Sequence, residues 1–150
     1  IGRIAEMHGR YYHDNWGFGL IFETMVATEL SDFLKRYNAA RDGFWTASNH
    51  GRVEAHITID GINSETKGAH LRYFIVSDEF RGTGIGRELI TGAVNFCREA
   101  GHRKVYLWTF GGLNAARHLY ESAGFRLVEM LKGSRWGVEV TEQRFELNLP

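Results

Sequence analysis

The sequence predicts an α+β fold in a single domain that covers residues 1–150. Three observations lead to this class. Apolar residues recur at helical spacing in several stretches, strand-like runs lie between them, and one of these runs ends in a glycine-rich loop that opens a helix. Neither an internal repeat nor a linker interrupts the chain, and 150 residues is a typical length for one domain.

Two helices and a hairpin are expected in the first sixty residues. Apolar residues three and four positions apart predict one helix before Gly17 and Gly19, and a second helix over residues 22–37. Residues 44–47, a turn at 49–51 and the alternating run 53–60 predict a pair of strands. The polar residues of that run are expected on the face opposite its apolar residues; they are Glu54, His56, Thr58 and Asp60.

The remaining residues predict further strands and helices. A polar loop at 61–68 precedes the strand 70–76, whose nearly continuous apolar run indicates that both of its faces are covered. A helix follows Gly86 and ends near Gly101, and residues 104–110 form the next strand. Asn114 can cap a short helix that Gly124 ends. Residues 125–131 and 138–149 predict two closing strands.

Composition and charge exclude several classes of protein. Eighteen basic and eighteen acidic residues give a net charge of zero, so the basic footprint of a nucleic-acid binder is missing and no direct nucleic-acid contact is expected. No apolar run is long enough for a membrane span, and the first residues lack a signal-peptide pattern. The single cysteine, Cys97, falls on an apolar helical stripe and indicates a reducing, cytoplasmic location. The histidines lack metal-ligand spacing, so no metal is expected.

The loop from Val76 to Arg87 is the most informative stretch. Glycines allow positive φ angles and close approach of a ligand, and the first N–H groups of the following helix have no internal acceptor. Such a loop can cradle a phosphate. It fits neither the Walker nor the Rossmann pattern but matches [R/Q]-x-x-G-x-[G/A] through Arg81, Gly84 and Gly86. The alternative is that these glycines only close a turn.

From about Gly43 to Leu149 the chain resembles the GNAT N-acetyltransferase superfamily. The resemblance rests on the Arg81–Gly86 loop, the strand Val105–Trp108 and the block N-A-A-x-x-L-Y-x-x-x-G-F from Asn114 to Phe125. The opening I-G-x-I-x-x-x-H-G-x-x-Y is similar to GNAT domains fused behind MarR-type regulators, and the chain starts at Ile1 without methionine, so a longer protein with an upstream DNA-binding domain is one expectation. One departure is that no strand precedes the first helix, as it does in most members of the superfamily.

The resemblance implies a central mixed, largely antiparallel sheet flanked by helices, with the strands at 70–76 and 104–110 splayed apart. It also implies acetyl-CoA as co-substrate, held in the splay. Tyr120 matches the tyrosine that protonates the departing thiolate, and its alternative role is packing. His70 lies eleven residues before Arg81, where some members carry the general base; Glu54, His56 and water are the alternatives. The expected acetyl-CoA-binding residues are Phe74, Ile75, Val76, Arg81, Gly82, Thr83, Gly84, Ile85, Gly86, Arg87, Asn114 and Arg117.

The resemblance also implies that the first helices contribute substrate contacts, and their aromatic and acidic side chains suit an amine. On this basis the expected substrate-binding residues are Tyr12, Trp16 and Glu23. The alternative is that about half of the aromatic and acidic residues in the first helices only pack in the core. Arg72 is a cation in an apolar strand, so we expect it to pair either with an internal acid such as Glu54 or with a substrate carboxylate.

The expected function is acetyl-CoA-dependent N-acetyl transfer to a primary amine of a small molecule, such as an amino acid or a xenobiotic amine, by direct attack in a ternary complex. Two alternatives stay open. One is a non-catalytic acyl-CoA-sensing domain of a transcriptional regulator, and the other is a protein N-acetyltransferase. A homodimer is compatible with each of these functions.

Overall fold

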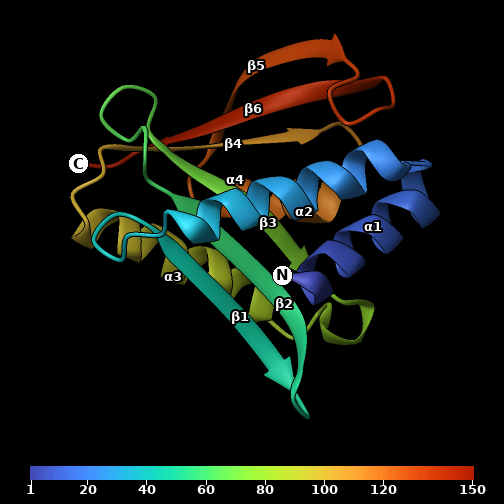
Figure 1. Ribbon diagram of the computed structural model, residues 1–150. Helices are drawn as coiled ribbons and strands as arrows, with labels where there is room; N and C mark the ends of the chain where they lie inside the picture. Colours follow the sequence, from blue (N-terminus) through green and yellow to red (C-terminus); the bar gives the residue numbers. More distant parts are fainter.

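Six strands form one mixed sheet in the order β1-β2-β3-β4-β6-β5 (Figure 1). All neighbouring pairs are antiparallel except β3 and β4, which are parallel. This confirms the predicted α+β class. The computed structural model describes residues 1–150. Its elements are α1 (Gly2–Trp16), α2 (Leu20–Lys35), β1 (Gly43–Asn49), β2 (Arg52–Asp60), β3 (Ala69–Val76), the single turn η1 (Asp78–Phe80), α3 (Ile85–Glu99), β4 (Lys104–Phe110), α4 (Asn114–Ser122), β5 (Arg126–Gly133) and β6 (Val140–Asn148).

The sheet opens between β3 and β4. Only two residue pairs join these strands, Ala69 with Val105 and His70 with Tyr106. Beyond these pairs the strands separate, and Figure 1 shows β1, β2 and β3 running away from β4, β6 and β5. The backbone departs from a regular strand near this point, since Tyr73 has a φ of +55° and the register between β2 and β3 shifts between His56 and Thr58. The splay that the sequence predicts is therefore present.

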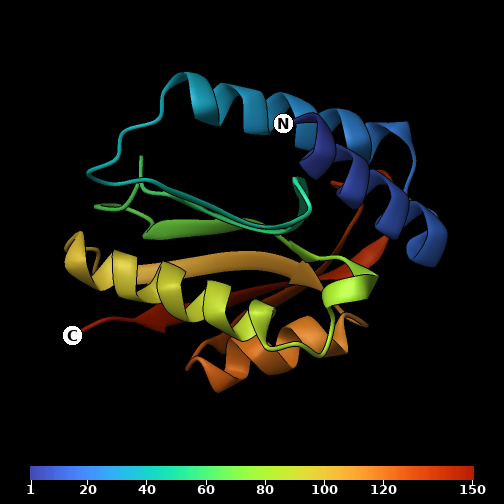
Figure 2. The ribbon, with the colours of Figure 1, turned by 90° about the horizontal axis from the view of Figure 1, so that it is seen from below.

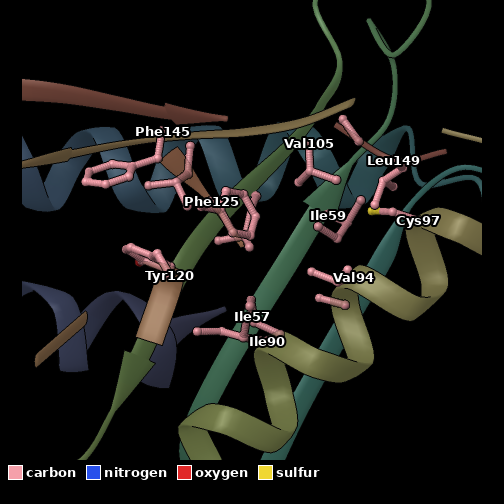
Figure 3. Packing of buried hydrophobic residues seen from close by; sticks show 14 residues of the cluster. Ile57, Ile59, Ile90, Val94, Cys97, Val105, Tyr120, Phe125, Phe145 and Leu149 are labelled. Carbon is pink, nitrogen blue, oxygen red and sulfur yellow. The ribbon is translucent and has the colours of Figure 1, made fainter. Parts of the chain in front are cut away.

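Helices cover both faces of the sheet, with α1 and α2 on one side and α3 and α4 on the other (Figure 2). The larger core lies beneath α3 and α4. There the apolar stripe of α3, formed by Ile90, Val94 and Cys97, packs against Ile57 and Ile59 of β2 (Figure 3). Cys97 is completely buried, as its place on that stripe predicts. No helix combines the length and the apolar character that crossing a membrane requires.

The second face of β2 is buried as well. Glu54, His56, Thr58 and Asp60 lie opposite the apolar residues, as the alternation predicts, and all four are at least 95% buried. The cause is the α1–α2 pair, which packs over this face and buries the polar side chains with it. They find partners there: His56 Nε2 lies 2.6 Å from Thr58 Oγ1, and Glu54 forms ion pairs with Arg3 and Arg52.

One local prediction is wrong, and a second holds with different residues. Leu113, not Asn114, is the N-cap of α4; Asn114 is the first helical residue, and no side chain caps this helix. Glu54 is not the partner of Arg72 because Arg3 and Arg52 occupy it. Arg72 instead contacts Asp60 of β2 and Glu29 of α2, so the expectation of an internal acid holds with different residues.

Candidate active site

Unpaired backbone N–H groups gather where the glycine loop enters α3. Gly82 and Gly84 have φ angles of +77° and +88°, which turn the chain so that successive N–H groups point outward. Thr83 and Glu88 use their N–H groups within the chain, on the carbonyls of Phe80 and Gly84. The N–H groups without an acceptor in the chain are those of Gly82, Gly84, Ile85, Gly86 and Arg87. Together with the positive end of the helix dipole, they form an anion-binding surface.

Arg81 holds this loop against its neighbours. Its Nε donates to the carbonyl of Val76 at 3.3 Å and lies 3.4 Å from Asp78 Oδ1. The guanidinium also lies over the ring of Tyr11, 4.6 Å from the centroid. Arg81 thus connects the end of β3, the loop and α1, and adds positive charge beside the free N–H groups.

The open edge of β3 continues from this loop. Ser77 donates its N–H to the carbonyl of Glu54 on β2, at 2.8 Å. Because successive residues of a strand point to opposite edges, the N–H of Val76 faces the gap toward β4. The carbonyl of Val76 points the same way, as its bond from Arg81 shows. An extended ligand in the gap would therefore meet backbone donors and acceptors.

A cleft of about 880 Å³ begins at the glycine loop and passes between β3 and β4. Its lining combines β3, β4, the loop and α4 with parts of α1 and α2 and with the segment between β5 and β6. The predicted site residues in the lining are Tyr12, His70, Arg72, Phe74, Ile75, Val76, Arg81, Gly82, Gly84, Gly86, Arg87, Asn114 and Tyr120. The fold therefore brings predicted residues from distant parts of the chain into one cleft.

The other predicted site residues lie outside the lining. Thr83 and Ile85 are the sequence neighbours of the lining residues Gly82, Gly84 and Gly86, and Thr83 donates its hydroxyl to the carbonyl of Phe80. Arg117 forms an ion pair with Glu121 one turn along α4. Trp16 packs on Phe110. Glu23 is exposed and lies against α1 at Gly9.

Tyr120 reaches the cleft from α4 and is 6% exposed. Its ring lies 6.0 Å from that of Phe74 and also packs near Phe125 and Phe145 (Figure 3). Its hydroxyl makes no hydrogen bond within the chain. Burial, with a smaller effect of Tyr12, raises the pKa of this phenol above its ordinary value. The hydroxyl is therefore protonated at neutral pH and free to donate into the cleft.

His70 lies where β3 and β4 still pair. Burial, followed by the positive charge of Arg72, lowers the pKa of its imidazole to about 3. The ring is neutral at working pH, so one nitrogen has a free lone pair that can accept a proton. Its affinity for that proton is weaker than that of an exposed histidine.

Comparison with known proteins shows which family has this architecture. The family model described as the acetyltransferase (GNAT) family matches residues 4–125. The chain belongs to this family. Among solved structures, a ribosomal-protein-alanine N-acetyltransferase from Brucella melitensis shares the fold with a TM-score of 0.75 and 17% identity, over 99% of this chain and 93% of that chain. A GNAT acetyltransferase from Elizabethkingia anophelis, solved with acetyl-CoA bound, has a TM-score of 0.65 and 16% identity, over 81% and 82% of the two chains.

Curated relatives of this GNAT chain are longer proteins. Human N-acetyltransferase 8B is 30% identical over 105 residues, which cover 67% of this chain and 46% of the relative. The N-acetylaspartate synthetase of Xenopus tropicalis is 30% identical over 125 residues, or 82% and 45% of the two chains. The chain spans less than half the length of both. None of these proteins is named as a MarR-type regulator, so the fusion stays a prediction.

Several cleft residues of the GNAT chain were missed by sequence reasoning. Glu29 of α2 reaches the cleft and accepts from Arg72 and, at 3.3 Å, from the hydroxyl of Tyr73. Arg135 and Trp136 enter the lining from the β5–β6 connection. Glu29 lies on a helix where acids are dispersed around an apolar stripe, and the β5–β6 connection has no periodic pattern, so neither carried a local signal.

Proposed function

We propose that the chain is an acetyl-CoA-dependent N-acetyltransferase that transfers an acetyl group to a primary amine of a small molecule, by direct attack in a ternary complex. The observation that carries this proposal is the set of unpaired N–H groups at Gly82 and at Gly84–Arg87, which lies next to the open edge of β3. The loop suits a pyrophosphate, and the strand edge suits an extended chain with amide groups. Coenzyme A combines these two features in one molecule.

The residues of the cleft fit acetyl-CoA. Free N–H groups and the cations Arg81 and Arg87 would hold its phosphates, and Asn114, which lines the cleft, would contact an amide of the pantetheine arm. Gly86 has little space around it, since an added Cβ would lie 3.1 Å from Leu119 and 3.3 Å from Phe74. When bound, acetyl-CoA supplies the activated acetyl group. The open-edge N–H of Val76 would stabilise negative charge that develops on the acetyl oxygen.

Two side chains would handle protons. Tyr120 would donate its hydroxyl proton to the departing thiolate, and its raised pKa keeps that proton in place until the reaction requires it. His70 would accept the proton of the attacking amine through its neutral imidazole, with water as the alternative acceptor. Arg72, Tyr12 and Glu29 border the part of the cleft where the amine would enter.

The names of the relatives support this proposal, since both curated relatives are described by an N-acetylated product or activity. The acetyl-CoA in the Elizabethkingia structure supports the same co-substrate. A homodimer, an upstream DNA-binding domain and a cytoplasmic location stay predictions alongside it. No specific observation favours the sensor or the protein-acetylating alternative.

The test is thiol release from acetyl-CoA with a panel of amines that includes amino acids, polyamines, aminoglycosides and peptide N-termini. Amine-dependent release, lost in Tyr120→Phe, is expected. Tight binding of acetyl-CoA without release for any amine would instead support the sensor. Release only with peptide N-termini would support the protein N-acetyltransferase.

A further inference from the structure

The charged residues of the cleft are unevenly distributed. Arg81 and Arg87 belong to the glycine loop at one end. The rest of the lining contains two further arginines, Arg72 and Arg135, and a single carboxylate, Glu29. The part of the cleft that would receive the amine is thus poor in acid, which does not favour a polyamine or another polycation.

Internal ion pairs occupy Arg72. Its Nη2 contacts Glu29, its Nη1 lies 3.4 Å from Asp60, and the side chain is 18% exposed. Asp60 also accepts two bonds from Arg36, at 3.0 and 2.7 Å. This group of two arginines and two acids has no net charge. Since both terminal nitrogens of Arg72 already face acids, Arg72 has little capacity left for a ligand.

Arg135 is held differently. Its guanidinium lies over the ring of Trp108, 4.4 Å from the centroid, and 5.6 Å from that of Trp136. Its Nε forms an ion pair with the buried carboxylate of Glu142, which does not line the cleft. Its two terminal nitrogens have no partner in the chain, and the side chain is 42% exposed. The guanidinium is thus fixed on one edge and on its face, while the other edge presents paired donors.

We propose that Arg135 binds a carboxylate of the acceptor, so that the substrate is an amino acid, or a similar primary amine with a carboxylate and an apolar side chain. A guanidinium edge with two parallel donors matches a carboxylate better than it matches any neutral group. The inference rests on the proposed function, because it names the substrate class of the same cleft. It also moves the carboxylate-binding role from Arg72, where the sequence suggested it, to Arg135.

Two neighbouring features support this assignment. Arg135 lines the same cleft as His70, and its positive charge adds a smaller effect to burial and Arg72, the main causes of the lowered pKa of His70. Aromatic and apolar residues make up most of the remaining lining, including Tyr12, Phe22 and Met25 from the first two helices. These side chains offer an apolar surface to the body of the acceptor.

The kinetic test compares L-phenylalanine, L-phenylalaninamide and 2-phenylethylamine as acceptors for the wild-type chain, Arg135→Gln and Arg135→Lys. Arg144→Gln is the matched control, because Arg144 also belongs to ion pairs near β5 and β6, with Glu129 and Glu146, but lies outside the cleft. The KM of each variant is divided by the wild-type KM for each amine separately, because this ratio cancels differences in amine basicity. Arg135→Gln is expected to raise KM for phenylalanine about ten- to hundredfold with little change in kcat.

The same variant should change KM for the amide and for phenylethylamine less than about threefold, and Arg135→Lys should recover part of the loss. An equal loss for all three amines would overturn the proposal. Equal effects of Arg135→Gln and Arg144→Gln would also overturn it.

A binding test separates this inference from the proposed function. Calorimetry in the presence of coenzyme A compares N-acetyl-L-phenylalanine with its amide, which differ only in the carboxylate. The acid is expected to bind about tenfold or more tightly than the amide in the wild-type chain, and equally in Arg135→Gln. If this pattern appears without thiol release for any amine, the transferase function fails and the carboxylate site stands. Equal affinity for acid and amide, or no binding of either, overturns the carboxylate site.

Discussion

The imidazole of His70 lies flat on the ring of Tyr106, with centroids 4.4 Å apart and planes at 15°. These two residues form the last pair that joins β3 to β4. The stacked rings therefore mark the point where the sheet divides and the cleft begins. A histidine in this position contacts both halves of the sheet.

Replacing His70 tests its assignment as general base. If it takes the amine proton, His70→Gln should lower kcat at pH 7 by about 10²-fold or more, and the loss should shrink near pH 9.5, where more of the amine arrives neutral. The pH profile of kcat measures this. The same fractional loss at both pH values would leave His70 a packing partner of Tyr106 and would favour water as the acceptor.

Tyr120→Phe removes one proton donor and keeps the ring packing near Phe74 and Phe125. We expect kcat to fall about 10²- to 10⁴-fold while the affinity for acetyl-CoA, measured by calorimetry, stays within about twofold. Tyr37→Phe is the control, because Tyr37 lies outside the cleft and is partly exposed. Wild-type kcat in Tyr120→Phe would remove this hydroxyl from the mechanism.

A methyl group at Gly84 tests the anion-binding loop. Gly84→Ala introduces a side chain at a φ of +88°, which costs about 1–2 kcal/mol of stability and disturbs the N–H groups around it. We expect the Kd for acetyl-CoA to rise tenfold or more. Gly92→Ala is the matched control, since Gly92 is exposed within α3 with open space around it; there stability should rise by about 1 kcal/mol at unchanged Kd. Wild-type affinity in Gly84→Ala would contradict the loop assignment.

Arg72→Lys should act mainly on stability. Lysine keeps the charge but cannot contact Asp60 and Glu29 through two separate nitrogens at once. Because Asp60 keeps Arg36 and Glu29 is partly exposed, we expect a loss of only about 1–2 kcal/mol in the free energy of unfolding. Urea denaturation measures this, with exposed Arg98→Lys as control. A rise in KM confined to carboxylate-bearing amines, at unchanged stability, would return the substrate role to Arg72.

Two buried histidines, His8 of α1 and His56 of β2, predict that acid weakens the fold. Burial lowers the pKa of His8 to about 4 and that of His56 to about 3, whereas both titrate near 6.5 when unfolded. As the pH falls below 6.5, the unfolded chain binds protons that the folded chain does not. The free energy of unfolding is therefore complete above that pH and declines toward pH 4, by about 1.4 kcal/mol per pH unit for each histidine.

Urea denaturation at several pH values measures this slope. His8→Phe removes one titrating group and keeps an aromatic ring near Tyr12, Phe22 and Tyr73, so it should reduce the slope by about one proton. His118→Gln, at an exposed position of α4, should leave the slope unchanged. A wild-type slope in His8→Phe would show that this histidine does not control the acid response.

Local sequence patterns were sufficient for the elements and for the loop. Gly82, Gly84 and Gly86 are informative because the backbone conformation, the free N–H groups and the preceding strand all belong to one short stretch. The block from Asn114 to Phe125 is similarly local, and Tyr120 does line the cleft. The prediction that Asn114 caps α4 is wrong because one asparagine before a helical pattern does not determine which residue begins the helix.

The features that the sequence did not predict depend on contacts between segments that are distant in the chain. The burial of His56 and Thr58 depends on α1 and α2 folding over β2, which no alternation within β2 can reveal. Glu29 and Arg72 are 43 residues apart, and their pairing depends on how α2 lies across β3. Arg135 enters the cleft from a connection with no periodicity, so only the folded chain brings it beside Trp108.

The separation of β3 and β4 leaves a sheet that is incomplete in its interior rather than only at its outer strands. Strand edges with unused hydrogen-bonding groups invite pairing with other chains. In this protein they lie inside a cleft, between α4 and the α1–α2 pair, where a second protein strand has restricted access. A slender ligand that added its amides there would complete the sheet. Because it would bind only the folded chain, it would raise the free energy of unfolding in proportion to the logarithm of the ligand concentration. Occupancy of the cleft would then protect the chain against unfolding as well as prime it for reaction.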